Sequence, residues 1–303
     1  MARKDLPKHI KLLAGKLFLP GFVALASRMR WDQAQVLGNL LGDLAYALSR
    51  RYRGQAIENL NMAYGEEWTK DQVKRVARQT FRNFARAAIE FFVVQDMSDQ
   101  ELRRVIPLRG KEHLDAALAK GNGAIFVTGH LGNWELLARG LVMAGYKINV
   151  IARDSDDPAM TGLFNTIRQS GGYTVLSRDD AIGPALRCLR KNEVLGILPD
   201  QNTLGPCVFA EFFGRPAATA TGPAVFSIRT GAPILTGFAA RKENGNYEGI
   251  IYPAISFHPT GDRDSDVRTL VQAYTTAIEN EIRKYPDQWL WLHGRWRRKP
   301  ETC

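Results

Sequence analysis

The residues best suited to catalysis lie in one short stretch that reads TGHLGNWE and contains His130 and Glu135. These two side chains are five positions apart, which is about 500° on a regular helix, so they would lie on different faces of it. They can meet only if His130 sits in a turn and Glu135 in the first turn of the following helix. Gly129 and Gly132 allow the tight backbone that this requires, and Asn133 is a favourable N-cap for the helix.

A histidine held by a carboxylate is typical of general base catalysis. A hydrogen bond from Glu135 would fix the tautomer of His130 and leave the second ring nitrogen free to take a proton from an alcohol. The sequence shows no GxSxG motif and no cysteine in a reactive setting, so the base would activate a hydroxyl of the substrate without an acyl-enzyme. An ordinary helix N-terminus, with a hydrogen-bonded histidine and a glutamate that favours the helix dipole, explains the same spacing. The spacing alone leaves both interpretations open.

The elements that must position this stretch follow from the hydrophobic pattern after about residue 108, where short apolar runs alternate with helical periodicity. Strands are predicted at residues 124–128, 148–152, 173–176, 194–198, 234–240, 247–255 and 289–293. Helices are predicted at residues 134–144, 158–170, 181–191, 219–230 and 266–285. This alternation predicts the α/β fold class, with a largely parallel central sheet flanked by helices.

Polar residues follow three of the predicted strands. His130 comes after the first of them, Arg153 after the second and Asp200 after the strand at 194–198. Because sites gather beyond the carboxyl ends of parallel strands, we expect the three to share one edge of the sheet, although each is also compatible with an ordinary loop.

The N-terminal third is predicted to be helical over residues 33–94, with a strongly periodic apolar stripe from residue 73 onwards. The opposite face of this second helix is basic and carries Lys74, Arg75, Arg78, Arg82 and Arg86. That face is either solvated or in contact with phosphates or an acidic partner. We expect three parts: a segment over 1–30 that lies on or anchors in a membrane, a helical region over 31–100 that belongs to the same membrane-associating part, and an α/β domain over 101–303.

The charge balance and the few cysteines narrow the class of protein. The chain has 303 residues, with 41 Lys and Arg against 31 Asp and Glu and a formal net charge of +10, which favours anionic partners. Three cysteines without a CxxC pair predict neither a disulfide framework nor a zinc site. The five histidines are scattered and form no HExxH motif. Neither a metal nor a cofactor is predicted.

An apolar run at residues 10–26 is interrupted by Lys16 and Pro20 and has basic residues on both sides. This pattern is typical of an interfacial anchor, and it is too interrupted to predict a spanning helix. A cleaved signal peptide is the alternative, because residues 24–26 read ALA.

Five blocks of the sequence, in order, resemble the bacterial lipid A secondary acyltransferases, a branch of the lysophospholipid acyltransferase class. They are GHLGNWEL at 129–136 for the HxxxxE motif, VIAR at 150–153 with Asp157-Pro158, LPDQ at 198–201 for the PDQ block, VF at 208–209 through FFG at 212–214 with TATG at 219–222, and WLWLHGRW at 289–296 for a WxHRR-like tail. Asn59-Leu60 with the arginine-rich helix that follows resembles the N-terminal region of the family. The likeness covers most of the chain.

The resemblance implies an acyltransferase that acts on a lipid A precursor or a related glycolipid. His130 would deprotonate a hydroxyl of the acceptor, and that oxygen would attack the thioester of an acyl carrier protein or of acyl-coenzyme A. Glu135 would orient His130 and stabilise its charged form. Arg153 would bind a phosphate or steady the oxyanion.

The remaining matches imply binding roles. Asp200, Gln201 and Asn133 would position the substrate, and residues 208–213 would line an acyl tunnel, with ordinary core packing as the alternative. The tryptophans and arginines of residues 289–299 are typical of a lipid–water interface, with a packed final strand and a basic tail as the alternative. The resemblance places the enzyme at the cytoplasmic face of the inner membrane, either peripherally or through a single N-terminal anchor.

Other functions remain compatible with the residues. A non-catalytic, membrane-associated lipid-binding protein would use the basic helix and the tail, with the His–Glu pair merely structural. An acyltransferase for a phosphatidylinositol mannoside or an aminolipid would share the same pair. A thioester hydrolase would use it on water, but no nucleophile of its own is visible. A nucleic-acid partner is not expected, because no recognised reading motif accompanies the charge.

Overall fold

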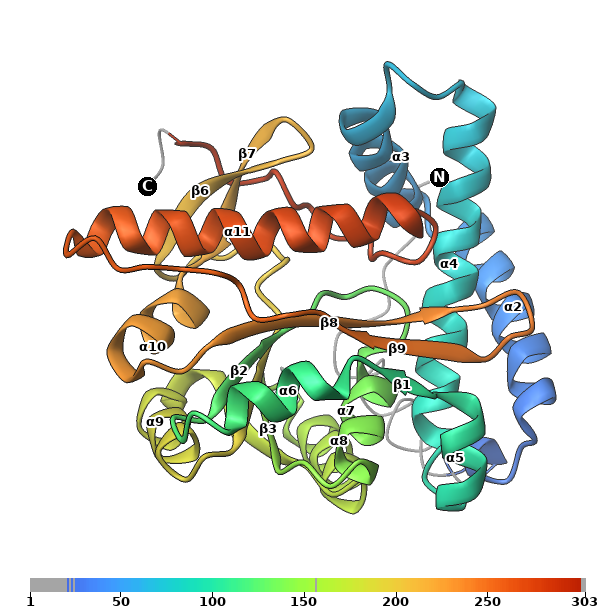
Figure 1. Cartoon of the computed structure of the whole chain (residues 1–303). Helices are drawn as coiled ribbons and strands as arrows, with labels where there is room; N and C mark the ends of the chain where they lie inside the picture. The colour runs from blue at the N-terminus through green and yellow to red at the C-terminus, as the bar shows by residue number, and fades with distance from the viewer. Residues whose placement is uncertain (1–20, 22, 24, 156, 301–303) are drawn as a thin grey trace.

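The computed structural model of the chain describes residues 21, 23, 25–155 and 157–300, and Figure 1 shows how its elements are arranged. Among these residues, seven strands form one sheet in the order β1-β9-β8-β2-β5-β3-β4, and β6 and β7 form a separate hairpin. The strands are β1 (Leu108–Arg109), β2 (Ala124–Val127), β3 (Ile148–Ala152), β4 (Thr174–Ser177), β5 (Val194–Ile197), β6 (Cys207–Phe212), β7 (Arg215–Ala220), β8 (Ile234–Arg241) and β9 (Tyr247–Ile251). The helices are α2 (Trp31–Leu48), α3 (Arg50–Tyr64), α4 (Lys70–Val93), α5 (Asp99–Val105), α6 (Lys111–Leu118), α7 (Trp134–Met143), α8 (Pro158–Ser170), α9 (Ile182–Arg190), α10 (Gly222–Thr230) and α11 (Arg263–Lys284), with a short 3₁₀ turn η1 (Arg178–Asp180).

The centre of the sheet is parallel. Strand β2 pairs in parallel with β5 and β8, and β3 pairs in parallel with β4 and β5. Only the β8–β9 pair is antiparallel, with β1 parallel to β9 at the edge. The predicted α/β fold with a largely parallel central sheet is therefore confirmed. Apolar runs gave the strand positions because β2 and β5 are buried along their whole length.

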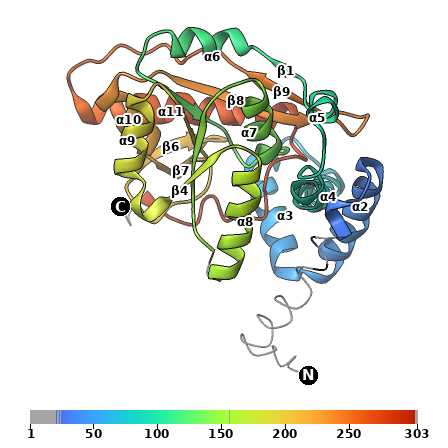
Figure 2. The same ribbon diagram turned by 90° about the horizontal axis from the view of Figure 1, so that it is seen from below.

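Helices cover both faces of the sheet, and β2 shows how. Ile125 and Val127 belong to one core cluster with residues of α9, α10 and α11, while Ala124 and Phe126 belong to a second cluster with residues of α5, α6 and α7. Successive side chains of a strand point to opposite faces, so both faces must be covered. Figure 1 shows α11 above β8 and α6 below it. In Figure 2, seen from below, α9 and α10 lie at one side of the molecule and α2 and α4 at the other, in agreement with Figure 1.

The N-terminal helices pack on the same core. Helix α4 starts with a capping box in which the Thr69 and Gln72 side chains each bond the other residue's backbone N–H. Leu60 of α3 and Ala77 of α4 share a core cluster with the sheet. The predicted divisions at residues 30 and 100 stay predictions.

The basic face of α4 is partly neutralised inside the chain. Arg78 and Arg82 both bind Asp43 of α2, with nitrogen–oxygen distances of 2.7 and 2.6 Å. These hydrogen bonds hold the pKa of Asp43 well below its usual value. The sequence predicts that the five basic side chains of α4 form a solvated or a phosphate-binding face. Two of the five instead connect α4 to α2.

Two predicted elements are wrong. Residues 289–293 form no strand; Trp289 makes a single bridge with Leu131, and a turn follows. The predicted helix at 219–230 begins only at Gly222, because Thr219 and Ala220 complete the β6–β7 hairpin. The turn of that hairpin uses positive φ angles at Phe213 and Gly214, as tight hairpins require. A phenylalanine at positive φ gave no turn signal in the sequence.

No helix in the part of the chain that the structure describes is long and apolar enough to cross a membrane. The anchor predicted at residues 10–26 lies mostly outside the described residues, so that prediction is not tested.

Candidate active site

The turn that carries His130 is held by backbone hydrogen bonds on both sides. The Gly132 N–H donates to the Gln288 carbonyl at 3.0 Å, and the Leu290 N–H donates to the His130 carbonyl at 3.0 Å. On the other side, the Asn133 N–H donates to the Ala239 carbonyl of β8 at 3.1 Å. The turn therefore lies between β8 and the segment after α11, which fixes its backbone.

Glycine is required at position 132. Its φ is +61°, and a Cβ atom would lie 1.8 Å from the Ala239 carbonyl oxygen. Both the left-handed backbone and the close approach exclude a side chain. The prediction that this glycine permits the tight turn is confirmed.

The carboxylate that holds His130 belongs to Asp200. His130 Nδ1 lies 2.8 Å from Asp200 Oδ1, and the His130 backbone N–H donates to Oδ2 at 2.7 Å. The sheet register explains this meeting: Val127 of β2 pairs with Ile197 of β5, and His130 and Asp200 each follow three residues later. Two parallel neighbouring strands thus deliver both residues to one edge of the sheet.

Asp200 is fully enclosed and fully bonded. Its side chain is 1% exposed, and the Trp289 indole N–H donates to Oδ2 at 2.8 Å. Burial by itself raises the pKa of Asp200, but the nearby His130, its hydrogen bonds and that of Trp289 outweigh burial and lower the pKa to about 2. Asp200 is therefore an anion at neutral pH. Its Oδ1 accepts the hydrogen bond that a proton-bearing Nδ1 of His130 donates.

The other side of the imidazole is open. The His130 side chain is 21% exposed, and no described residue hydrogen-bonds Nε2. The Trp134 ring meets the imidazole edge to face, with centroids 4.8 Å apart. With Nδ1–H held by Asp200, Nε2 carries the lone pair that can accept a proton from a substrate.

Glu135 does not orient His130, which corrects the predicted His130–Glu135 contact. Its oxygens instead accept hydrogen bonds from Arg168 of α8, the shortest at 2.6 Å, and from the Tyr173 hydroxyl at 2.6 Å. At the first turn of α7 the side chain points toward α8 and β4 and away from the preceding turn. The predicted contact joined two residues that are close in the sequence. In the structure, Glu135 lies in the first turn of α7 and its side chain points away from the His130 ring, toward Arg168 and Tyr173.

Asn133 is buried and has structural partners. It is 1% exposed, its side-chain oxygen caps α7 by accepting from the Leu136 N–H at 3.0 Å, and its amide donates to Glu90 at 2.9 Å. The N-cap prediction is confirmed. The substrate-binding role assigned to Asn133 stays a prediction, and this geometry favours positioning over direct contact.

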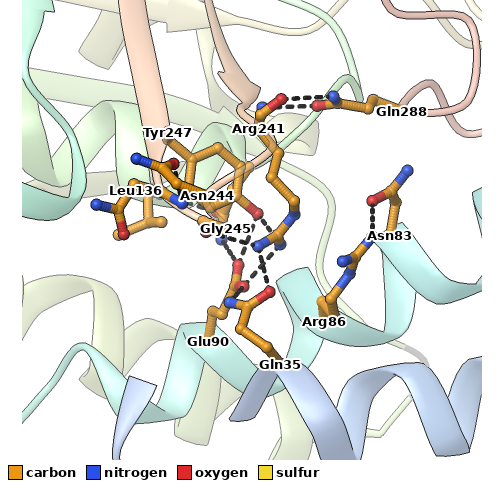
Figure 3. Close-up of polar contacts among 12 residues, drawn as sticks. Gln35, Asn83, Arg86, Glu90, Leu136, Arg241, Asn244, Gly245, Tyr247 and Gln288 are labelled. Atoms are coloured by element: carbon orange, nitrogen blue, oxygen red, sulfur yellow. Dashed lines mark hydrogen bonds and ion pairs between the residues drawn. The ribbon is translucent and has the colours of Figure 1, made fainter. Parts of the chain in front are cut away.

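Glu90 of α4 is the centre of a buried polar network next to the turn (Figure 3). Besides Asn133, it accepts hydrogen bonds from Gln35, Arg241 and Tyr247. Glu90 is 0% exposed, and its ion pair with Arg241 has a nitrogen–oxygen distance of 2.6 Å. Residues from α2, β8 and β9 thus converge on the α4 side chain that holds Asn133.

Gln288 extends the network to the other side of the turn. Its side chain exchanges two hydrogen bonds with the backbone of Arg241, at 2.7 and 2.9 Å, while its carbonyl accepts from Gly132. Arg241 therefore connects α4 to both supports of the catalytic turn.

The other predicted binding residues lie at the same sheet edge or close to it. Arg153 is exposed directly after β3, and Gln201 is half-buried directly after Asp200. Their substrate contacts stay predictions. Residues 208–213 belong mainly to β6, where Phe212 packs on Trp289 and Trp296, which supports the core alternative for this end of the segment.

The tryptophan-rich tail belongs to the core and not to a lipid–water interface. Trp289, Trp291 and Trp296 are at most 5% exposed, and Arg295 is 1% exposed. Arg295 donates to the Ala218 carbonyl and the Thr219 hydroxyl, each at 2.5 Å. Burial lowers its pKa to about 10. The interface interpretation is wrong for these four buried residues, because they pack in the core beside β6 and β7. For the exposed Arg297 and Lys299 it stays a prediction.

Sequence reasoning missed the partners that lie far away in the chain. Asp200 was proposed for substrate binding, and its place after a buried strand was the only signal for its link to His130. Arg168, Tyr173 and Glu90 gave no signal that distinguishes them from ordinary surface residues of amphipathic helices and strand ends.

The site contains a base for a hydroxyl group and no described serine or cysteine hydrogen-bonded to that base, which is the arrangement of an enzyme that activates its substrate's alcohol or a water molecule. A model of the bacterial lipid A biosynthesis acyltransferase family matches residues 12–298, and the chain belongs to this family. It is therefore an acyltransferase, and its reaction transfers the acyl group to an acceptor.

Relatives of two kinds, lipid A biosynthesis acyltransferases and phosphatidylinositol mannoside acyltransferases, match the chain. A lipid A biosynthesis lauroyltransferase of Escherichia coli (strain K12) is 28% identical over 93% of this chain and 90% of the relative. A lipid A biosynthesis acyltransferase of Haemophilus influenzae is 25% identical over 94% of this chain and 87% of the relative. A phosphatidylinositol mannoside acyltransferase of Mycobacterium tuberculosis (strain CDC 1551 / Oshkosh) is 27% identical over 72% of this chain and 69% of the relative.

Proposed function

We propose that this acyltransferase moves a fatty acyl chain from a thioester to a hydroxyl group of a glycolipid, with His130 as the general base and Asp200 as the carboxylate that orients it. The acceptor is a lipid A precursor or a related glycolipid, and the donor is acyl carrier protein or acyl-coenzyme A. The observation that carries the proposal is the His130 ring, bonded at Nδ1 by a buried anion and open at Nε2.

The reaction follows from that geometry. As the acceptor oxygen attacks the thioester carbonyl, Nε2 of His130 takes the hydroxyl proton. The new carbon–oxygen bond forms, the carbon–sulfur bond breaks, and the leaving thiolate takes the proton from His130. The imidazolium that exists between these steps lies beside the anionic Asp200, which stabilises it.

Glu135 has a positioning role in this proposal. Its bonds with Arg168 and Tyr173 tie the start of α7 to α8 and to the residue just before β4, so they hold Trp134 and the end of the catalytic turn in place. Arg153, exposed at the same sheet edge, is proposed to bind a phosphate of the acceptor or donor.

An assay of purified protein tests the proposal. Lipid A precursors and phosphatidylinositol mannosides are offered with acyl carrier protein and coenzyme A thioesters, and mass spectrometry identifies the product. His130→Ala is expected to abolish transfer while the matched control His258→Ala, which alters an exposed loop histidine, keeps it. Full activity of folded His130→Ala, or thioester hydrolysis with no acylated lipid, would disprove the proposed mechanism.

A further inference from the structure

Helix α2 has its large apolar side chains on the outside. Val36, Leu40, Leu44 and Leu48 are 61, 63, 53 and 66% exposed. They recur every fourth residue, so they share one face of the helix. Leu25 before the helix and Tyr52 after it are 65 and 52% exposed. Most of the exposed large apolar side chains of the described residues lie on this part of the chain.

The inward face of α2 carries small residues. Ala34, Gly38 and Gly42 are buried, and the two glycines contact the backbone of α4 at Arg86 and Arg82. Residues two positions apart in the sequence are rotated by about 200° around a helix, so Leu40 points away from both glycines. An ordinary surface helix has the reverse arrangement, with large apolar residues inside and polar residues outside. Small residues at the helix contact and leucines outside are typical of helices that face lipid.

The charges around this face are complementary to an anionic surface. Arg28 and Arg30 precede α2 and Arg50 and Arg51 follow it, all four exposed. The two acids of the helix are already bound, Asp43 by Arg78 and Arg82 and Asp32 by Arg30. A second copy of the chain would bring the same arginines and the same net charge of +10, which opposes pairing through this face.

We propose that the outer face of α2, formed by Val36, Leu40, Leu44 and Leu48, docks on a bilayer that contains anionic lipid, with the helix parallel to the membrane plane. The 18 residues of α2 do not span a membrane; their leucines enter the boundary between headgroups and acyl chains while the arginines at both ends meet lipid phosphates. This inference rests on the proposed function, because a glycolipid acceptor lies in a bilayer and the enzyme must reach it there.

A matched pair of variants tests the surface. Leu40→Glu places a charge in the proposed face, and Ile182→Glu changes a 66% exposed side chain of α9, at the opposite side of the molecule in both views. Co-sedimentation with phosphatidylcholine vesicles doped with phosphatidylglycerol is measured for the full chain. Burying one leucine is worth roughly a tenfold change in partitioning or more. We therefore expect Leu40→Glu to bind at least ~10-fold more weakly, with a larger loss for Leu40→Glu/Leu44→Glu, and Ile182→Glu to bind like the unchanged protein.

Activity separates this inference from the proposed function. With an acceptor dispersed in detergent, Leu40→Glu is expected to keep its turnover rate, whereas transfer to an acceptor in vesicles falls in parallel with binding. If the unchanged protein shows no transfer in detergent, the proposed function fails. Vesicle binding of the variants still tests whether the outer face of α2 docks on a membrane. Equal vesicle binding by all folded variants would overturn the membrane surface. So would a lipid-free dimer that Leu40→Glu converts to a monomer, because the face would then be occupied by a second copy.

Discussion

Replacing Asp200 by asparagine tests the central feature of the site, because the two side chains have the same shape and differ in charge and hydrogen bonding. Asp200 accepts three N–H donors: His130 Nδ1 and the His130 backbone, and the Trp289 indole. Asparagine has one acceptor oxygen. If that oxygen keeps the two donors at Oδ2, the new NH₂ group faces Nδ1 and can only donate to it. The ring is then forced into the tautomer that carries its proton on Nε2, and Nε2 can no longer accept one from the substrate.

The magnitude follows from the charge and the tautomer. The surroundings lower the pKa of Asp200 from 3.8 to about 2, so they favour its anion by about 2 kcal/mol after the cost of burial. This stabilisation, shared with the imidazolium that forms during transfer, is lost in Asp200→Asn. Loss of a buried carboxylate that sets the histidine tautomer lowers kcat on the order of 10⁴-fold in the serine protease triad. We expect a decrease of roughly 10³-fold to 10⁴-fold in kcat, with little change in KM because the Asp200 side chain is only 1% exposed.

The assay is steady-state transfer by purified Asp200→Asn, together with nitrogen chemical shifts of the labelled imidazole, which report its tautomer. Glu135→Gln is the matched control, because it also replaces a carboxylate by an amide near the turn but does not touch the ring. It is expected to leave the tautomer of His130 unchanged and to act through weaker bonds to Arg168 and Tyr173. An Asp200→Asn enzyme with nearly normal kcat, or a tautomer change in Glu135→Gln alone, would refute the assignment of Asp200 and return the role to Glu135.

Two further outcomes are expected from buried groups. Glu90→Ala leaves the Arg241 guanidinium buried without its partner, so unfolding by denaturant should show a loss of about 3–5 kcal/mol, with a smaller loss for Glu90→Gln; equal stability of all three proteins would contradict the network. Burial lowers the pKa of His293 below its usual 6.5, and Nε2 accepts from the Asn202 N–H at 3.0 Å. The unfolded state then binds more protons than the folded state once the pH falls below about 6.5, so thermal stability should decrease with falling pH there, and His293→Gln should show a flatter dependence.

The sequence predicted those features of the site that depend on local pattern. Short buried runs located β2 and β5, and glycines on both sides of His130 indicated a turn. The position of Asp200 after a strand placed it at the correct sheet edge. The predicted partner was nevertheless Glu135, because periodicity does not reveal which strands are neighbours. The adjacency of β2 and β5 and the pairing of Val127 with Ile197 bring together residues 70 positions apart, and only tertiary structure shows this.

The C-terminal prediction failed for a related reason. The alternating tryptophans from Trp289 predict a strand or an interface, but their large rings pack against the β6–β7 hairpin without a neighbouring strand edge to pair with. Trp289 also has an indole N–H that finds a buried acceptor in Asp200. An aromatic residue with a polar group serves two environments, and composition does not distinguish a buried acceptor from a membrane interface.

The catalytic turn depends on three distant parts of the chain at once. Glu90 of α4 holds Asn133, and β8 binds the backbone of the turn through Ala239. Gln288 and Leu290 bind that backbone from the C-terminal side, and Trp289 of the same segment bonds Asp200. The histidine and its carboxylate follow two neighbouring strands of the sheet, and elements from outside that strand pair bond the turn that carries the histidine. Helix α2 contacts the same network through Gln35 while its leucines face outward. The helix proposed to rest on the membrane is therefore directly hydrogen-bonded to the polar network that supports the base.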